Sequence, residues 1–248
     1  MVNLLNRKQQ KVQGLITYFN NKQMKKKTVI ISLGGSLVVP NEIDISFLKK
    51  LKICLTKYFN NNQFIVFVGG GKVCRRYQKV LQDFGAKNKA CDWMGIKISR
   101  LNAEIVKQVF EKNSDKEVVA NPTKKIISKK RVVVGAGFLP GHSTDYDAVL
   151  SAKANGASTV INLSNIDYVF DKDPLKFPNA RALDKINWPD FRKLVGDKWT
   201  PGFSSPFDPT ASKLAEKIKL KVIIINGKYL NRLEDFLNNK PFIGTTIQ

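Results

Sequence analysis

The sequence has little from which to build a metal centre or a disulfide framework. It contains one histidine and three cysteines, and no two cysteines have the Cys-x-x-Cys spacing of zinc and redox sites. An odd number of cysteines without a recognisable secretory signal indicates reduced thiols. We therefore expect Cys54, Cys74 and Cys91 to be buried structural residues of a cytoplasmic protein, and we predict no metal ligands among the side chains.

Long hydrophobic runs and internal repeats are also missing. No apolar run approaches the roughly 18 residues needed to cross a bilayer, so the sequence predicts no membrane association. No linker or low-complexity block divides the 248 residues. Hydrophobic residues make up 43% and charged residues 25%, which is typical of a globular protein. A chain of this length can bury a sizeable core within one large α/β domain.

Negative charge is scarce, and none occurs before Glu42. The formal net charge is +22, which raises the question of nucleic acid as a partner. The basic residues are mostly lysines spread along the whole chain, without an arginine-rich patch or an RNA-recognition motif. Nucleic-acid binding is therefore not the preferred interpretation, and anionic substrates or a general lysine bias explain the charge better.

The first 27 residues form a basic extension that differs from the rest of the chain. A second methionine, Met24, opens the segment Met-Lys-Lys-Lys-Thr-Val-Ile-Ile and would be a plausible start of translation. We predict that residues 28–248 form the folded domain. Our hypothesis is that residues 1–23 are dispensable for it.

Five apolar runs rich in β-branched residues predict a mostly parallel sheet. Each run ends directly before glycine or turn residues; the runs are 28–33, 64–68, 131–134, 159–163 and 221–225. Continuous apolar runs suit strands that are covered on both faces. Helical spacing of apolar residues occurs between them, over 47–58, 94–109 and 214–218. Alternating strands and helices predict an α/β fold, a three-layer αβα sandwich whose ligands bind at the carboxyl ends of the strands.

Two glycine loops follow the first two predicted strands. Gly34, Gly35 and Ser36 form the first loop, in which glycines serve turn geometry about as often as phosphate binding. The second loop, 69–75, has three consecutive glycines followed by Lys72 and Arg75 at the start of a helix. Cations are disfavoured at a helix N-terminus unless an anion is bound there, so a phosphate site is favoured over a structural turn. The Walker pattern is absent.

A third loop, 135–145, follows the third predicted strand. It partly matches a dinucleotide-binding fingerprint, but its third glycine stands one residue late, which makes binding of NAD a poor second interpretation. Ser143, Thr144 and Asp145 offer hydroxyl and carboxylate groups that suit a nucleotide. They would equally suit an ordinary helix cap.

Taken together and in order, these segments resemble the motifs of archaeal-type UMP kinases, which belong to the amino acid kinase superfamily. The motifs are ISLGGSL, FVGGGKVCRRY, CDWMGIKISRLNAEIV, PGHSTDYDAVLSAKANGA, SNIDYVFDKDP, SSPFDPTASKLA and the terminal GTTI. The resemblance covers about residues 28–248. It implies transfer of the γ-phosphoryl group of ATP to UMP in pyrimidine nucleotide biosynthesis, with a UMP-binding half over about 28–146 and an ATP-binding half over about 147–248. Isopentenyl phosphate kinases share the superfamily but have a histidine in an early glycine loop, where this chain has none.

The resemblance also implies roles for individual residues. The residues implied to bind ATP are Gly34, Gly35, Ser36, Gly71, Arg75, Ser164, Asn165, Phe170 and Asp173. The residues implied to bind UMP are Gly70, Asp92, Leu139, Pro140, Gly141, His142, Ser143, Thr144 and Asp145. The residues implied to be catalytic are Arg75, Asp208 and Lys213. Mg²⁺ is expected to accompany ATP, and a homo-oligomer, by resemblance a hexamer, is the expected assembly.

Each of the chemical roles has a structural alternative. His142 would position the substrate or serve only the fold, Asp208 would cap a helix, and Lys213 would be solvated. Many superfamily members carry a lysine directly before Leu-Gly-Gly, whereas this chain has Ser32. Phe170 stands where relatives have an aromatic hydroxyl, which leaves the preference for adenine open. The alternative function is a catalytically weak nucleotide-binding protein with a storage or regulatory role on the same fold.

Overall fold

The computed structural model describes residues 26–202 and 205–248, so the basic extension lies outside it except for its last two residues. The strands are β1 (Lys27–Leu33), β2 (Asn62–Val68), β3 (Val132–Gly135), β4 (Thr159–Ser164), β5 (Val169–Phe170), β6 (Ala182–Leu183), β7 (Lys185–Ile186), β8 (Lys221–Asn226) and β9 (Thr245–Ile247). The helices are α2 (Gly35–Val38), α3 (Ile45–Thr56), α4 (Gly71–Asp83), α5 (Asn88–Phe110), the 3₁₀ turn η1 (Glu111–Asn113), α6 (Thr144–Asn155), α7 (Trp188–Val195), α8 (Pro209–Lys217) and α9 (Leu230–Leu237).

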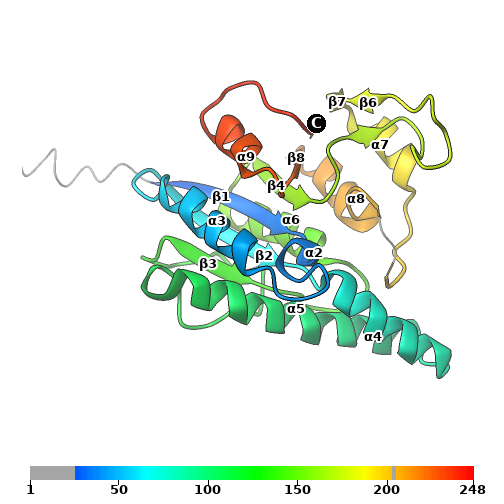
Figure 1. Ribbon diagram of the computed structural model, residues 1–248, viewed down its shortest axis with the longest axis horizontal. Coiled ribbons are helices and arrows are strands. Elements are labelled where there is room, and N and C mark those ends of the chain that lie inside the picture. Colours follow the sequence, from blue (N-terminus) through cyan, green and yellow to red (C-terminus); the bar gives the residue numbers. More distant parts are fainter. Residues whose placement is uncertain (1–25, 203–204) are drawn as a thin grey trace, which may run out of the picture.

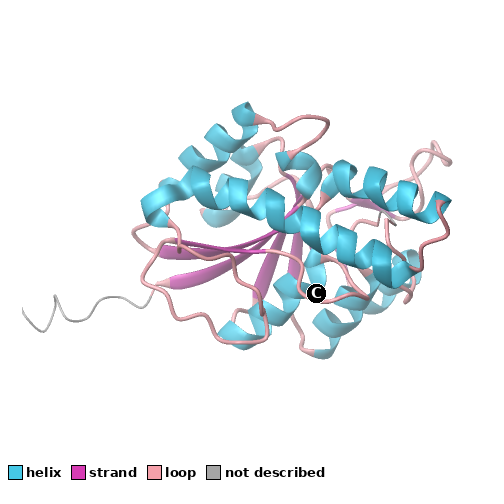
Figure 2. Cartoon of the chain, turned by 90° about the horizontal axis from the view of Figure 1, so that it is seen from below, coloured by secondary structure: helices cyan, strands magenta, loops and turns pink. Residues whose placement is uncertain are grey.

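Parallel strands form the centre of a seven-stranded sheet. The strand order is β3-β2-β1-β4-β8-β9-β7. The first five of these strands run parallel, β9 is antiparallel to β8, and β7 pairs in parallel with β9. β5 and β6 form a separate antiparallel pair. Figure 2 shows the sheet between two layers of helices, which is the αβα sandwich that the strand and helix pattern predicts.

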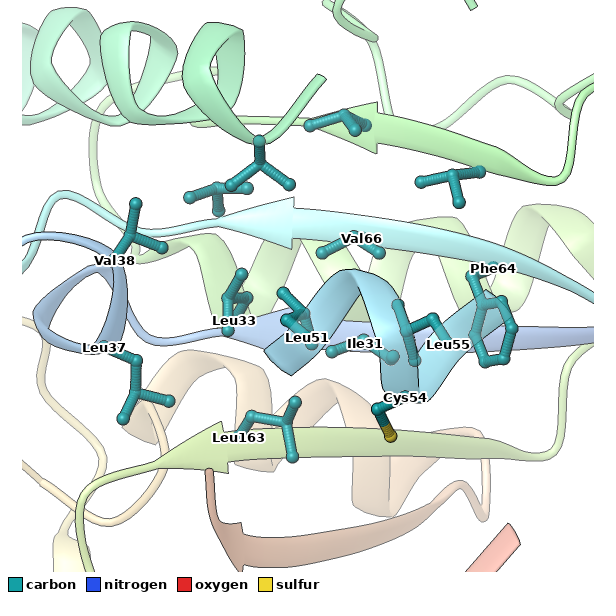
Figure 3. Close-up of a cluster of buried hydrophobic side chains, with 14 of the residues drawn as sticks. Ile31, Leu33, Leu37, Val38, Leu51, Cys54, Leu55, Phe64, Val66 and Leu163 are labelled. Atoms are coloured by element: carbon teal, nitrogen blue, oxygen red, sulfur yellow. The ribbon is translucent and has the colours of Figure 1, made fainter. Parts of the chain in front are cut away.

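Alternate side chains of the central strands enter two different cores. Ile31 and Leu33 of β1 point to one face, where they join Leu51 and Leu55 of α3 (Figure 3). Ile30, the residue directly before Ile31 in β1, joins the core on the opposite face, with α6, α7 and α8. Because the side chains of a strand alternate between faces, one continuous apolar run supplies both cores. Figure 1 shows α3 and α5 together on one side of the sheet.

The central strands confirm the five predicted runs, with ends that differ by at most two residues. The helices α3, α5 and α8 are confirmed as well, although α5 begins at Asn88, well before the apolar spacing starts at 94. The pattern did not predict α7, α9 or the short strands β5, β6, β7 and β9. These strands have two or three residues each, which is too short for periodicity to be visible.

Helix α4 packs along α5 and extends past the sheet (Figure 1). Its buried residues are Cys74 and Gln78, while Tyr77, Val80 and the C-cap residue Phe84 are exposed. Over residues 26–202 and 205–248, no helix is both long enough and apolar enough to cross a membrane.

Candidate active site

The loops after β1, β2 and β4 leave the sheet at the same edge. Leu33, the last residue of β1, lies opposite Val68 of β2 and opposite Leu163 of β4. In the sheet, β2 and then β3 lie on one side of β1, and β4 and then β8 lie on the other. The loops on either side of β1 therefore diverge, and this divergence opens a crevice of the kind in which α/β sheets bind ligands.

A cleft of about 250 Å³ occupies this position. It is lined by most of the residues to which the sequence assigns a role, namely Gly34, Gly35, Ser36, Gly70, Gly71, Arg75, Asp92, His142, Ser143, Thr144, Asp145, Ser164, Asn165 and Asp208. The three predicted loops, far apart in the sequence, thus meet around one common cleft.

Six residues with predicted roles are not part of the cleft wall. Gly141 lies close behind it, because its N–H donates to Asp92 Oδ2 at 2.9 Å. Phe170 belongs to β5, Asp173 accepts a hydrogen bond from the N–H of Leu175, and Lys213 is exposed on α8. The remaining two are Leu139, which is exposed, and Pro140. The roles of these six residues stay predictions, as do those of the residues that line the cleft.

The glycines of the first two loops are required by contact between the loops themselves. A Cβ atom on Gly35 would lie 2.1 Å from the carbonyl oxygen of Gly69, and one on Gly71 would lie 2.4 Å from the carbonyl carbon of Gly35. Gly71 also has a φ of 66°, a conformation that other residues rarely adopt. The two backbones therefore interlock, and packing explains glycines for which the sequence offered turn geometry and phosphate binding as alternatives. The same close approach leaves the backbone N–H groups of both loops near the cleft.

Asp145 lines the cleft and is held by neutral donors. The Ser32 hydroxyl donates to Asp145 Oδ1 at 2.6 Å, and the Asn162 side-chain amide donates to the same oxygen at 2.9 Å. Asp145 Oδ2 accepts the backbone N–H of Asp208 at 3.2 Å. Burial raises the pKa of Asp145 to about 6, and the Ser32 hydrogen bond opposes that rise. The position that often carries lysine in the superfamily thus holds a hydroxyl that binds this carboxyl group.

Asp208 links the third loop to the start of α8. Its Oδ1 accepts the backbone N–H groups of Thr210 at 2.6 Å and of Ala211 at 2.9 Å, which caps α8. Its Oδ2 accepts the backbone N–H of Ser143 at 2.7 Å. Asp208 is 2% exposed, so its carboxylate has little contact with water. The helix cap and the cleft residue are the same group, and the two interpretations of the sequence do not exclude each other.

Asp92 lies on the opposite side of the cleft, on α5. Besides the Gly141 N–H, it accepts the indole N–H of Trp199, whose Nε1 lies 3.2 Å from Asp92 Oδ1. Trp199 also lines the cleft. This contact joins residues that are 107 positions apart and belong to the two predicted halves of the domain.

His142 lies over a second buried carboxyl group, that of Asp147. His142 Nδ1 is 3.2 Å from the carbonyl oxygen of Ser143 and 3.7 Å from Asp147 Oδ1. The ring also stacks on Tyr146 with centroids 4.4 Å apart. Burial lowers the pKa of His142, and burial raises the pKa of Asp147 well above its ordinary value. A largely neutral imidazole at neutral pH fits a positioning role better than a charged one.

Permanent positive charge is sparse in the cleft. Among the described residues that line it, Arg75 alone carries such a charge, and its Nη2 lies 3.4 Å from Ser36 Oγ. The bond joins the two glycine loops, as expected for a group that would bind an anion between them. Backbone N–H groups and any bound cation would have to provide the remaining charge compensation.

Sequence reasoning missed the roles of Asn162, Asp147 and Trp199. Asn162 gave a signal, since it is a polar residue within an otherwise apolar buried strand, and such residues require a partner. Asp147 falls on the first turn of α6, where an acidic residue is ordinary. Trp199 gave no signal, because its contact with Asp92 depends entirely on the path of the chain between α7 and α8.

Comparison with known proteins agrees with this geometry. The model of the amino acid kinase family matches residues 27–226, and the chain belongs to this family. The uridylate kinase of Pyrococcus abyssi is 34% identical over 223 residues, which cover 89% of this chain and 99% of that protein. The uridylate kinase of Thermoplasma volcanium is 31% identical over 225 residues, covering 90% of this chain and 98% of that one.

Solved structures of uridylate kinases and UMP kinases superpose on this chain. The uridylate kinase of Archaeoglobus fulgidus superposes with a TM-score of 0.75 at 30% identity and covers 90% of this chain and 100% of its own. The UMP kinase of Ureaplasma parvum superposes with a TM-score of 0.71 at 19% identity, over 91% of this chain and 100% of its own, and so shares the fold.

Proposed function

We propose that this chain is a UMP kinase, which transfers the γ-phosphoryl group of ATP to the phosphate of UMP and releases ADP and UDP. The observation that supports this most directly is the convergence of residues 34–36, 69–75 and 142–145 around one cleft. Two glycine loops with approachable backbone N–H groups suit phosphate chains. The likeness to uridylate kinases over nearly their full length supports UMP as the acceptor.

In this proposal neighbouring glycines face different nucleotides. Gly71 would contact the donor phosphates and Gly70 the acceptor phosphate, so that the two meet head to head. The donor side would be completed by residues of the loops after β1, β2 and β4, with Phe170 and Asp173 reached by the outer part of ATP; the lining members are Gly34, Gly35, Ser36, Arg75, Ser164 and Asn165. The acceptor side would be formed by Asp92 together with residues 139–145.

Alignment and charge compensation would carry the reaction. The attacking group is an oxygen of the acceptor phosphate, which is already ionised, so no general base is needed. Asp208 would hold the N–H of Ser143, and with it the acceptor loop, in place. Arg75 would bind donor oxygens, and Lys213 would stabilise the phosphoryl group in transit.

Mg²⁺ would accompany ATP and would neutralise charge on its phosphate chain. The described residues contain no group of three or more His, Cys, Asp or Glu arranged to hold a metal ion. Both oxygens of Asp145 and of Asp208 already accept hydrogen bonds from the protein. These carboxyl groups therefore fit a metal that would be held mainly by nucleotide oxygens and water.

The test is a coupled assay of ADP release with UMP, CMP, AMP and isopentenyl phosphate as acceptors, under Mg²⁺ and ATP. We expect UMP to give the highest kcat/KM of the four. No turnover above background with UMP would overturn the kinase and would favour a nucleotide-binding protein without catalysis. Such a result would be explained by Ser32 and by the presence of Arg75 as the single cation among the described lining residues.

We also propose that the chain assembles as a homo-oligomer, by resemblance a hexamer, in the cytoplasm. Tyr77 and Val80 of α4 and Phe84, which directly follows the helix, are exposed and support a contact between subunits, because their spacing places them together on one side. Light scattering of the full chain at several concentrations should give a mass near six times 27.9 kDa.

A further inference from the structure

One contact in the cleft ties a carboxylate of the acceptor side to the opposite half of the chain. Asp92 is 8% exposed, and its two oxygens have one protein donor each. The donor to Oδ2 is the backbone N–H of Gly141 at 2.9 Å, and the donor to Oδ1 is the indole N–H of Trp199 at 3.2 Å. The Gly141 N–H belongs to the third loop, 135–145. The indole donor comes from the segment that follows α7.

A carboxylate can only accept hydrogen bonds, so it would not be placed against a phosphate group. Its natural partner in a nucleotide is a sugar hydroxyl or a base N–H. In the structure, the Trp199 indole already lies against the oxygen that such a group would use. The cleft of about 250 Å³ is also smaller than the roughly 300–1,000 Å³ of a typical pocket for one drug-sized ligand. Two nucleotides need more room than this arrangement of the cleft leaves.

We propose that Trp199 is a specificity-determining residue that occupies the acceptor's place at Asp92 and leaves it when the acceptor nucleotide binds. The inference rests on the proposed function, because it takes Asp92 to be part of the acceptor site. An acceptor with a hydroxyl or N–H donor in the right place replaces the indole hydrogen bond with one of its own. An anion without such a donor cannot replace the indole N–H. Trp199 then stays bonded to Asp92, and the anion makes no hydrogen bond with this carboxylate.

The exchange predicts the sign of the change in UMP affinity when the Trp199 N–H is removed. The Trp199 bond has a length at the upper end of the normal range, so giving it up has a modest cost. A phenylalanine at 199 has no N–H and does not compete for Asp92. We therefore expect Trp199→Phe to bind UMP about three- to tenfold more tightly than the wild type, the range that corresponds to one net hydrogen bond. A tryptophan that acted as a contact for the bound nucleotide would give the opposite sign.

Tryptophan fluorescence makes the exchange visible in the absence of ATP. The chain has three tryptophans. Trp188 is buried in the core beneath α7, where its N–H donates to the carbonyl oxygen of Leu220. Trp93 follows Asp92 on α5, is 39% exposed and does not line the cleft. Trp93→Phe is therefore a matched control that removes a neighbouring indole and keeps the Asp92 contact.

The experiment titrates UMP, and separately inorganic phosphate, into the full-length chain and into the two variants. Emission spectra and calorimetric affinities are recorded together. We expect UMP to change the emission of the wild type and of Trp93→Phe but not of Trp199→Phe. We expect inorganic phosphate to leave all three spectra unchanged.

Three results would overturn the inference. UMP binding seen by calorimetry without an emission change that depends on Trp199 would show that the indole stays in place. Weaker UMP binding by Trp199→Phe would show that the indole is a contact for the ligand instead of its competitor. Absence of any UMP binding by the wild type would overturn both this inference and the proposed function, whereas the first two results leave the kinase intact.

Discussion

The cleft contains two kinds of carboxylate site, and they are held in different ways. Asp145 and Asp208 accept hydrogen bonds from backbone N–H groups and short side chains of β1, β4 and α8. Asp92 is held by one backbone N–H and by one long side chain from a connecting segment. The first pair lies at the starts of α6 and α8, with Asp145 also bonded to the central strands, whereas the second site depends on a side chain that a ligand can displace.

This difference indicates a division of labour. Groups that must be aligned for phosphoryl transfer are held by the most rigid elements of the fold, since misplacement by an ångström is costly in rate. Groups that recognise the acceptor lie where one hydrogen bond can be exchanged for another. The following substitutions test this comparison and begin with the largest expected effect.

Asp208→Ala should have the largest effect. It leaves the N–H groups of Ser143, Thr210 and Ala211 without their acceptor, so we expect the free energy of unfolding to fall by about 3 kcal/mol. We expect kcat to fall by about 100-fold or more, because the acceptor loop loses its anchor. Denaturant unfolding and the coupled assay measure the two effects.

Asn187→Ala is the matched control for that change. Asn187 caps α7 by accepting the N–H of Asp190 and does not line the cleft. Its loss should cost about 1 kcal/mol of stability with no change in kcat. Similar losses of kcat in both variants would mean that Asp208 acts through stability alone.

Arg75→Ala and Asp92→Ala should separate the two ligands. We expect Arg75→Ala to weaken ATP binding about tenfold or more and to leave UMP affinity within about twofold, since a charged hydrogen bond is lost on one side only. Asp92→Ala should show the reverse pattern. Calorimetry with each nucleotide alone measures both. Equal effects of both variants on both ligands would show that the division of the cleft into donor and acceptor sides is wrong.

Asp145→Asn should change how stability depends on pH. The pKa of Asp145 is about 6 in the folded state against 3.8 ordinarily, so the folded state binds this proton more tightly than the unfolded state does. The resulting contribution to the free energy of unfolding is fully present below about pH 4. That contribution is lost as the pH rises through about 6, because the folded state then has to bury a charge. We expect the unfolding free energy of the variant, relative to wild type, to rise by up to about 3 kcal/mol between pH 4 and pH 7. A flat difference would contradict the assignment.

Ser32→Ala should have the smallest effect. It removes one donor to Asp145 Oδ1 while Asn162 keeps its own bond to that oxygen, so a loss of about 1 kcal/mol is expected at neutral pH. The hydroxyl stabilises the ionised carboxylate, so its removal should move the pKa of Asp145 further upward. The pH series above, repeated with Ser32→Ala, would show a higher midpoint; a lower one would contradict the role of Ser32.

Much of the fold could be predicted because its signals are local. The central strands are continuous apolar runs that end in glycine or turn residues, and the register places their ends at one edge. Part of the cleft wall follows from this, because Gly34, Gly35, Ser36, Gly70, Gly71 and Asn165 come within three residues of the ends of those strands. The short strands β5, β6, β7 and β9 could not be predicted, since two or three residues show no period.

The sequence alone determined which segments carry the chemistry, because glycine, serine and aspartate directly after buried strands can be recognised without knowing any distance. Only the tertiary structure decided which donors these groups share. Ser32 and Asn162 lie on neighbouring strands, 130 positions apart, yet bind one oxygen of Asp145. The meeting of Trp199 with Asp92 likewise depends on how two halves of a chain pack, and hydrogen bonds of that kind leave no periodic trace in a sequence.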